Sequence, residues 1–285
     1  MIRIAEMAAR DGLQNEAAHV PAGVKIAFID ALSLTGVQEI EAGAFVAPRM
    51  IPQLQDAEEV FAGIRRAPGV TYSALVPNER GLDRALRSKV DKIAVFTAAS
   101  ETFNRHNINA SIDESIERFE PVVRRAREAG LPIRGYISTA FFCPYEGAVP
   151  PTKTIEVTQR LLDLGVDEVS IGDTIGKAVP TEVLRLLDLL LPLVASDRLA
   201  MHFHDTYQHA VENVIASRSR GITLFDSSAG GIGGCPYAPG ASGNVSTEAV
   251  VLALRQGGDE VGVDLEAVRK AGNVIAVALG RPFPA

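Results

Sequence analysis

Apolar and polar positions follow two different periods along this chain. Short, largely apolar runs, such as 71–76 and 199–203, some of them with β-branched residues, are each followed by a longer run with apolar residues every three or four positions. The first pattern is typical of buried strands and the second of amphipathic helices, and their alternation indicates parallel βα units. The predicted strands are Ile2–Ala9, Gln38–Ala42, Thr71–Val76, Lys92–Phe96, Ile133–Ser138, Glu168–Ile171, Leu199–Phe203 and Ile222–Asp226.

A predicted helix follows each of these strands, and several helices carry their own stop signals. Gly36, Gly130, Gly165 and Gly221 each stand just after an amphipathic run, where glycine readily adopts the left-handed conformation of a helix C-cap. The predicted helices are Ala22–Thr35, Asp56–Arg66, Glu79–Ser88, Asp113–Ala129, Lys153–Leu164, Thr181–Val194, Tyr207–Arg220 and Val245–Gln256, with Asp264–Leu279 as one more.

Eight βα pairs in 285 residues predict a (β/α)8, or TIM, barrel. A doubly wound open sheet is the alternative, but it favours a Gly-x-Gly-x-x-Gly turn after the first strand, and residues 9–14 read Ala-Arg-Asp-Gly-Leu-Gln. We expect one domain over residues 1–285, with the barrel at about 1–257 and an appended helical segment at about 258–285. The chemistry of such barrels gathers at the C-terminal ends of the strands.

Composition narrows the partners of the chain. Its 28 basic and 35 acidic residues give a formal net charge of -7, which argues against nucleic acid or an anionic membrane surface. The apolar run 184–195 contains Arg185 and Asp188 and is too short to span a bilayer. The two cysteines, Cys143 and Cys235, are far apart and favour a reducing compartment. With no signal-like run at residues 1–6, we expect a cytoplasmic protein.

A His-x-His pair closes the seventh predicted strand. Residues two apart in a strand point to the same side, so His202 and His204 project together, about 7 Å apart. Such a pair can reach a single ion held between the two rings. The alternative is two polar residues at a strand end, hydrogen-bonded to neighbours or water. We predict a metal site.

Polar residues also stand where other predicted strands end. At one strand end such a residue would indicate only a surface turn or an ion pair. At five of eight ends, all on the same rim, the residues predict a shared site. They are Arg10 and Asp11 after the first strand, Glu41 in the second, Asp173 after the sixth, His202 and His204 at the seventh, and Asp226 at the eighth.

The types of side chain available at this rim limit the choice of ion. Two imidazoles and an aspartate oxygen form a mixed nitrogen and oxygen set without thiolate, which zinc would accept. Added oxygen and water ligands would instead suit Mg²⁺ or Mn²⁺. Spacing alone does not decide between them.

A glycine-rich loop follows the eighth predicted strand. Residues 229–244 contain six glycines, and the loop is long for a βα connection. It is either a flexible connector or a mobile flap that shields a reactive intermediate from water. Cys235 lies in its middle, where a thiol with an ordinary pKa near 8.5 could donate or accept a proton. Asn244 is either an N-cap of the next helix or a metal ligand through its side-chain oxygen.

Four stretches of the chain resemble the 3-hydroxy-3-methylglutaryl-CoA lyase family. They are Arg-Asp-Gly-Leu-Gln-Asn-Glu at 10–16, Ile-Glu-Ala at 40–42, His-Phe-His-Asp-Thr-Tyr at 202–207, and Gly-Gly-Cys-Pro-Tyr-Ala-Pro-Gly-Ala-Ser-Gly-Asn-Val at 233–245. The resemblance runs from Arg3 to about Gly280, and its most specific part is Gly-Gly-Cys-Pro-Tyr. Members of this family are metal-dependent TIM-barrel lyases related to isopropylmalate and homocitrate synthases.

The resemblance implies a reaction and a role for each matching residue. The reaction is the cleavage of 3-hydroxy-3-methylglutaryl-CoA, or a close 3-hydroxyacyl-CoA, to acetyl-CoA and acetoacetate or the corresponding 3-oxo acid. It depends on a divalent metal, Mg²⁺ or Mn²⁺. The implied metal ligands are Asp11, His202, His204 and Asn244, the implied catalytic residues are Arg10, Glu41, His202 and Cys235, and Arg10 and Asp173 would bind the substrate.

Several residues depart from the family's pattern. Ala8 and Ala9 replace a common Gly-Pro, Ala17 replaces a common Lys, and Gln208 replaces a common Gly. None of these changes removes an implied metal ligand or Cys235. We therefore expect these changes to affect which acyl group of the substrate is accepted more than the type of reaction.

Other functions stay open at this point. The chain could be a condensing enzyme of the same superfamily that joins acetyl-CoA to a 2-oxo acid, although those proteins typically carry extra C-terminal regulatory regions. It could also be an aldolase that acts on a free acid, or a silent barrel that binds metal or acyl-CoA as a regulator. The resemblance further suggests a homodimer or a higher oligomer.

Overall fold

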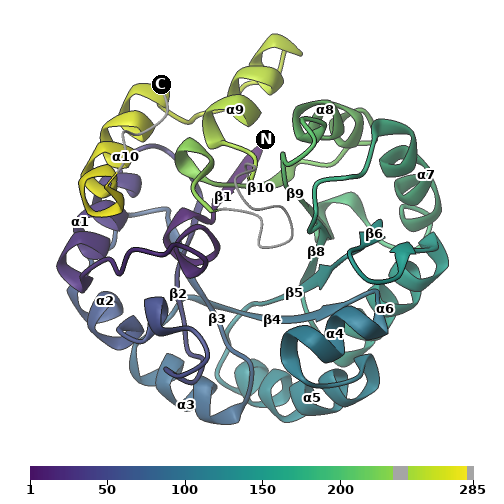
Figure 1. Ribbon diagram of the computed structural model, residues 1–285, viewed down its shortest axis with the longest axis horizontal. Coiled ribbons are helices and arrows are strands. Elements are labelled where there is room, and N and C mark those ends of the chain that lie inside the picture. Colours follow the sequence, from purple (N-terminus) through teal and green to yellow (C-terminus); the bar gives the residue numbers. More distant parts are fainter. Residues whose placement is uncertain (234–242, 281–285) are drawn as a thin grey trace.

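A closed barrel of eight parallel strands forms the centre of the protein (Figure 1). The computed structural model describes residues 1–233 and 243–280. The strands follow one another around the barrel in chain order, and the last pairs with the first, with Arg3 opposite Leu224 and Glu6 opposite Ser227. The TIM-barrel prediction is therefore confirmed. The strands are β1 (Arg3–Glu6), β2 (Glu39–Ala44), β3 (Thr71–Leu75), β4 (Lys92–Ala98), β5 (Ile133–Ser138), β8 (Glu168–Asp173), β9 (Leu199–Phe203) and β10 (Leu224–Ser227).

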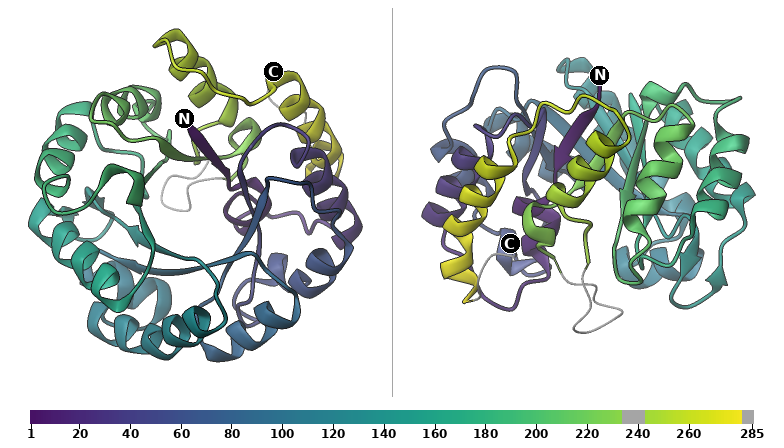
Figure 2. Two further views of the ribbon diagram at one scale, coloured as in Figure 1. Left: turned by 180° about the vertical axis from the view of Figure 1, so that it is seen from behind. Right: turned by 90° about the horizontal axis from the view of Figure 1, so that it is seen from above.

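Helices surround the barrel on its outer side (Figures 1 and 2). The extra C-terminal helix packs against the first helix, so the appended segment completes the outer ring next to the chain's beginning. Among the described residues, no helix is both long and apolar enough to cross a membrane. The helices are α1 (Ala22–Leu32), α2 (Ala57–Gly63), α3 (Glu79–Arg87), α4 (Glu101–Ile108), α5 (Ile112–Glu128), α6 (Pro151–Leu164), α7 (Pro180–Leu190), α8 (Ala210–Ser219), α9 (Thr247–Gln256) and α10 (Leu265–Leu279).

The first strand is shorter than predicted. The sequence pattern extended it to Ala9, but β1 ends at Glu6, and a π-helical turn, η1 (Ala8–Gly12), follows. In this turn the Gly12 amide donates a hydrogen bond to the Met7 carbonyl, 3.1 Å away. The prediction was wrong because the apolar residues before Arg10 are buried in the helical turn, as they would also be in a strand. The apolar run therefore could not distinguish the two conformations. The turn carries Arg10 and Asp11 at the C-terminal end of the barrel.

Two elements lie outside the predicted pattern. Helix α4 follows β4, and a small antiparallel hairpin of β6 (Phe142–Cys143) and β7 (Gly147–Ala148) follows β5. Both belong to βα connections at the C-terminal end of the strands. They therefore add structure on the side where the chemistry of such barrels is found.

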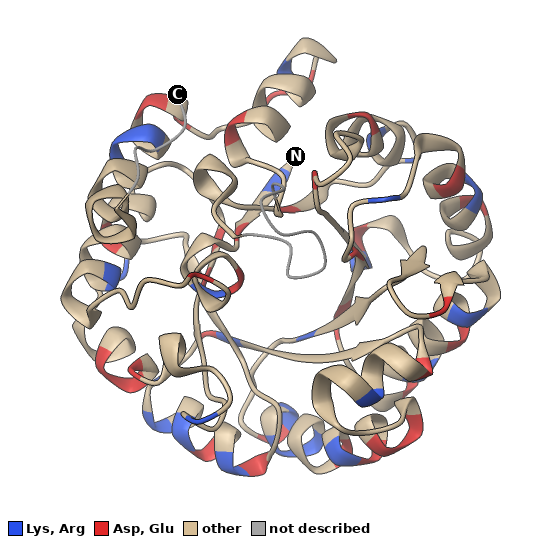
Figure 3. Cartoon of the chain, in the orientation of Figure 1, with Lys and Arg blue, Asp and Glu red and all other residues tan. Residues whose placement is uncertain are grey.

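The interior of the barrel is ionic. TIM barrels usually fill this space with layers of branched aliphatic side chains. Here the fully buried Arg134 donates hydrogen bonds to Glu168 (Nε to Oε1, 2.7 Å) and Asp226 (Nη1 to Oδ1, 2.8 Å). Lys92 pairs with Glu39 (Nζ to Oε2, 2.8 Å) and also with Glu168. Charged residues accordingly occur on the strands as well as on the outer helices (Figure 3).

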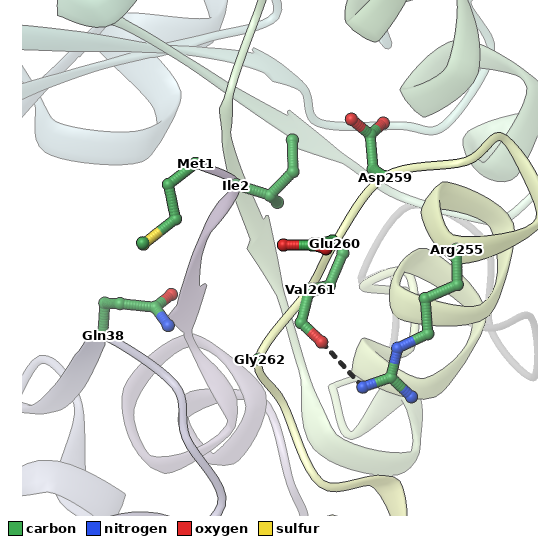
Figure 4. A pocket seen from close by; sticks show the side chains of 8 residues that line it. All are labelled: Met1, Ile2, Gln38, Arg255, Asp259, Glu260, Val261 and Gly262. Atoms are coloured by element: carbon green, nitrogen blue, oxygen red, sulfur yellow. Dashed lines mark hydrogen bonds between the residues drawn. The ribbon is translucent and has the colours of Figure 1, made fainter.

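A pocket of about 400 Å³ lies at the opposite end of the barrel, beside Ile2 and Gln38, which precede β1 and β2 (Figure 4). The guanidinium of Arg255 lines it but already donates hydrogen bonds to the carbonyls of Val261 (2.7 Å) and Val263 (2.5 Å). This pocket is therefore separate from the strand ends where polar residues converge.

Candidate active site

Three side chains from distant parts of the chain meet at the C-terminal end of the barrel. Asp11 lies on η1, His202 on β9, and His204 just beyond β9. One potential ligand atom of each lies within 4.8 Å of the other two. The imidazole rings lie on the same side of the strand, with ring centroids 5.3 Å apart. These groups are close together only because the barrel is closed: β10 pairs with both β1 and β9, which brings Asp11 next to the two histidines.

Asn244 lies next to this cluster. Its backbone forms an isolated antiparallel bridge with His204, and its side-chain Nδ2 donates a hydrogen bond to Asp11 Oδ2, 2.9 Å away. Its position is thus fixed by the β9 end of the site, and Ser246, not Asn244, is the N-cap of α9. A half-turn of the amide would direct its oxygen instead of its nitrogen to the cluster.

The charges around Asp11 favour a cation. Burial raises the pKa of this carboxyl group, but Arg10, His202 and His204 and the hydrogen bond from Asn244 together lower it to about 2. Burial and the neighbouring His202 lower the pKa of His204 to about 4, so that this imidazole is neutral near pH 7. A carboxylate and a neutral imidazole are both ready to bind a metal ion without first losing a proton.

The donor set fits a divalent metal ion. It offers one carboxylate oxygen and two imidazole nitrogens, a combination that first-row and group-2 divalent ions accept when water or amide oxygens complete the shell. The Nδ1 atom of His204 is buried and has no hydrogen-bond partner among the described residues. A buried polar atom without a partner is costly in a folded protein, and a bound ligand would remove that cost.

Arg10 joins the metal cluster to Glu41. Its Nη1 donates a hydrogen bond to Asp11 Oδ1 (2.7 Å), and its Nε donates one to Glu41 Oε2 (2.5 Å). The guanidinium also lies 5.5 Å from the ring centroid of Tyr136. Burial alone would lower the pKa of Arg10. The negative charges of Glu41 and Asp11 outweigh this effect and raise the pKa above its ordinary value, so the guanidinium stays charged. Burial raises the pKa of Glu41.

Comparison with known proteins shows which family the chain belongs to. The family model described as HMGL-like matches residues 1–275. This chain belongs to the HMGL-like family. A Pseudomonas aeruginosa protein named 3-hydroxy-3-isohexenylglutaryl-CoA/hydroxy-methylglutaryl-CoA lyase is 48% identical over 280 residues, which cover 98% of this chain and 93% of that protein.

Two further relatives agree with this assignment. The hydroxymethylglutaryl-CoA lyase of Pseudomonas mevalonii is 47% identical over 279 residues, covering 98% of this chain and 93% of the relative. The crystal structure of the HMG-CoA lyase from Brucella melitensis superposes with a TM-score of 0.96 at 50% identity, covering 98% of this chain and 99% of the other. The similarity therefore extends over the whole barrel.

One predicted site residue of this HMGL-like chain, Asp173, stands apart from the cluster. Asp173 is buried, and its carboxylate oxygens accept hydrogen bonds from the backbone amides of Lys177 (3.2 Å) and Ala178 (2.9 Å). Burial raises its pKa to about 6. Its carboxylate thus holds the loop after β8, and its role toward substrate stays a prediction. Cys235 lies outside the described residues, and its role also stays a prediction.

Sequence reasoning missed Glu6 of this HMGL-like chain. Its Oε1 accepts hydrogen bonds from the amides of Ala8 and Ala229, both at 2.9 Å, and its Oε2 accepts one from Thr247 Oγ1 at 2.7 Å. It thereby joins η1 to the segments that follow β10. Burial raises its pKa to about 7, although these hydrogen bonds oppose the shift. The available signal was a lone acidic residue inside the apolar run 4–9.

Proposed function

We propose that this HMGL-like chain is a divalent-metal-dependent carbon–carbon lyase that cleaves 3-hydroxy-3-methylglutaryl-CoA to acetyl-CoA and acetoacetate. The observation that carries the proposal is the contact between the Asp11, His202 and His204 cluster and the charged guanidinium of Arg10. The names of the full-length relatives, which are lyases of this thioester, support the substrate.

The proposed reaction needs three steps at one place. The substrate's tertiary hydroxyl loses its proton, the bond to the carbon beside the thioester breaks with its electron pair passing into an enolate, and the enolate carbon takes up a proton. A divalent ion, when bound, supplies Lewis acidity that makes the hydroxyl more acidic. We assign Asp11, His202, His204 and Asn244 as the residues that hold it.

Arg10 is assigned to the thioester oxygen, where negative charge develops. Its Nε and Nη1 atoms are held by Glu41 and Asp11, which fixes the plane of the guanidinium before substrate binds. Its Nη2 atom has no hydrogen-bond acceptor in the described part of the chain and can donate to the substrate. A positive charge that is already oriented stabilises an enolate more than one that must first reorganise.

The remaining assignments complete the catalytic set. We assign Cys235 as the donor of the proton to the enolate carbon, because a thiol can transfer a proton near neutral pH. Glu41 orients Arg10 through their hydrogen bond. Asp173 shapes the loop after β8 at the active site by holding the amides of residues 177–178. His202 lies between Asp11 and the buried Asp226, and we assign it as a metal ligand.

The finer properties of the protein follow from the same features. We assign Mg²⁺ or Mn²⁺ as the ion, because the set contains oxygen donors and no thiolate among the described residues.

A cytoplasmic location agrees with the free, buried Cys143. A homo-oligomer is suggested by the family resemblance, and light scattering of the purified protein would measure its mass.

A thioester panel tests the function directly. Purified protein with Mg²⁺ or Mn²⁺ is given 3-hydroxy-3-methylglutaryl-CoA, 3-hydroxy-3-isohexenylglutaryl-CoA and the free acid 3-hydroxy-3-methylglutarate, and acetyl-CoA release is followed in a coupled assay. We expect release from the first thioester, none from the free acid, and none after chelation of the metal. Consumption of acetyl-CoA with a 2-oxo acid, and no cleavage of either thioester, would favour a condensing enzyme instead.

A further inference from the structure

A buried carboxylate lies behind one of the two histidines. Asp226 on β10 and His202 on β9 are register partners in neighbouring strands, and both side chains enter the barrel. Asp226 Oδ2 lies 3.4 Å from His202 Nδ1, whereas His202 Nε2 lies 4.0 Å from Asp11 Oδ2 on the side of the cluster. The imidazole of His202 therefore stands between two carboxylates that face its two different nitrogens.

Asp226 is itself fixed by two donors. Arg134 Nη1 donates to its Oδ1 and Ser170 Oγ donates to its Oδ2, both at 2.8 Å. Because a guanidinium can only donate, it requires an acceptor at Oδ1. The side chain of Arg134 is completely buried and is held on its other edge by Glu168, so it does not turn away. Asp226 thus presents a fixed acceptor to His202.

The two histidines differ in this respect. Neither Nδ1 atom makes a hydrogen bond among the described residues, but that of His202 lies 3.4 Å from the carboxylate oxygen Oδ2 of Asp226. In a neutral imidazole one nitrogen carries the proton and the other a lone pair. An acceptor at Nδ1 places the proton there and leaves the lone pair of Nε2 directed toward Asp11 and the ion.

We propose that Asp226 is a positioning residue that fixes the tautomer and the orientation of His202 for the metal ion, and that Arg134 holds Asp226 in that role. The inference rests on the metal site of the proposed function. It assigns a task to the ionic interior of the barrel: the interior supports the site from below through one continuous chain of contacts, from Arg134 to Asp226 to His202.

The substitution Asp226→Asn tests this inference sharply. Asparagine has nearly the same shape, but it offers one acceptor and one donor group. Arg134 would take the amide oxygen, so the amide NH₂ would face Ser170 and His202. The imidazole would then have to accept at Nδ1 and carry its proton on Nε2, where the ion should bind. The same exchange of tautomer explains why an asparagine inactivates the triad of serine proteases.

Metal binding is the first measurement. We expect Asp226→Asn to raise the dissociation constant for Mn²⁺, measured by calorimetry on the whole protein, by about ten- to a hundredfold. The matched control is Glu39→Gln, which removes one charge from the same ionic interior but faces Lys92 and Arg134 rather than His202. We expect the control to stay within about threefold of the wild type. Equal losses in both variants would overturn the inference.

The tautomer itself is the second measurement, and it also works on the unaltered protein. In wild-type protein loaded with Mg²⁺ and carrying isotope-labelled histidine, heteronuclear NMR should show an Nδ1 proton of His202 that exchanges slowly with water, and none so protected on His204. If His202 Nδ1 carries no proton, or loses it as fast as His204, the inference is wrong even if Asp226→Asn does not fold.

The outcomes separate this inference from the proposed function. Cleavage of the thioester by the wild type together with unchanged Mn²⁺ affinity in Asp226→Asn would overturn the role of Asp226 alone. A wild-type protein that binds no Mn²⁺ would overturn both. Weakened Mn²⁺ binding in Asp226→Asn, a normal Glu39→Gln control and a protected Nδ1 proton would together support it.

Discussion

Asp11 is the residue on which the charges of the site depend. It accepts hydrogen bonds from Arg10 and Asn244 and lies beside both histidines. Its pKa of about 2 keeps it ionised throughout the physiological range. It is therefore the negative charge that balances both the guanidinium and a bound cation.

Replacing this charge should abolish the activity while leaving the fold. We expect Asp11→Asn to lower turnover of 3-hydroxy-3-methylglutaryl-CoA by about a thousandfold or more, because several kcal/mol of metal-dependent stabilisation would be lost. Turnover at saturating Mn²⁺ and the circular dichroism spectrum are the measurements. Near-normal turnover in this variant would contradict the metal assignment.

Glu6 shows how burial can make a single carboxyl group sensitive to pH. Its pKa is raised to about 7, so between its ordinary value of 4.5 and pH 7 the folded protein holds a proton that the unfolded chain has released. In that window the unfolded state binds fewer protons, and the free energy of unfolding falls as pH rises. The shift corresponds to about 3 kcal/mol.

The variant Glu6→Gln isolates this effect. Its amide oxygen can accept from Ala8 and Ala229, and its NH₂ can donate to Thr247, whose hydroxyl can turn toward Ser227 Oγ at 2.8 Å. We expect the stability of the wild type relative to this variant to fall by about 2.5 kcal/mol between pH 5 and pH 8, measured by urea unfolding. Parallel pH profiles for the two proteins would disprove the shift.

At the scale of elements, the turn η1 positions two site residues through a close backbone contact. A Cβ atom on Gly12 would come within 2.9 Å of the Ile232 carbonyl oxygen, and one on Gly233 within 2.9 Å of the Gly12 Cα. The turn therefore packs against the segment after β10 with no room for a methyl group. This contact holds Asp11 at its distance from Asn244.

A methyl group at Gly12 should consequently displace the turn. We expect Gly12→Ala to lower the free energy of unfolding by about 1–3 kcal/mol and to weaken Mn²⁺ binding, because overpacking shifts the backbone next to Asp11. Gly23→Ala is the control: it also lies in a helix, α1, but its Cβ would meet no atom within 4 Å, so stability should rise by up to about 1 kcal/mol. Equal metal affinity in both variants would contradict the argument.

Much of the element pattern could be read from the sequence. The spans of β5 and β9 agree with their predictions, since each is a short run with clear breaks before it: Gly130 and Pro132 precede β5, and the polar run 196–198 precedes β9. Helix α4 was not predicted because its residues, Glu101–Ile108, are mostly polar and show little apolar periodicity. The strands of the hairpin β6–β7 have two residues each, too few for a periodic signal.

The site could be predicted in part for a general reason. In any parallel barrel the strand ends share one rim, so residues such as Asp11 and His202 must converge once the fold is known. The interior could not be predicted in this way. The alternation of Glu39, Ile40 and Glu41 is typical of a strand with one face in water, and only the closed barrel places both carboxylates inside.

At the scale of the whole molecule, the ionic interior makes stability depend on the balance of a few buried charges. Arg134 contacts Glu39, Glu168 and Asp226, and Lys92 contacts Glu39 and Glu168. Within the part of the chain that the structure describes, Arg134 is the buried arginine or lysine that pairs with Asp226. Removing one member of a buried ion network leaves charges that neither water nor protein can compensate.

We expect Arg134→Met to lower the free energy of unfolding by about 3–5 kcal/mol, with little dependence on salt. Arg65→Met is the surface control: this arginine pairs with Asp30 at 2.8 Å, but its side chain is 87% exposed, so we expect a loss below about 1 kcal/mol. Urea unfolding at low and high salt measures both. A similar small loss in the two variants would mean that the interior charges contribute little.

The metal cluster lies where the first and last strands of the barrel meet. Asp11 follows β1, the two histidines end β9, and Asn244 follows β10. A ribosome releases the carboxylate early and the imidazoles and the amide only near the end of synthesis. A growing chain therefore holds the whole proposed ligand set only after residue 244 has been added. At the proposed metal site, a bound ion would stabilise only chains long enough to close the barrel, because it would bind a site that the open intermediates lack.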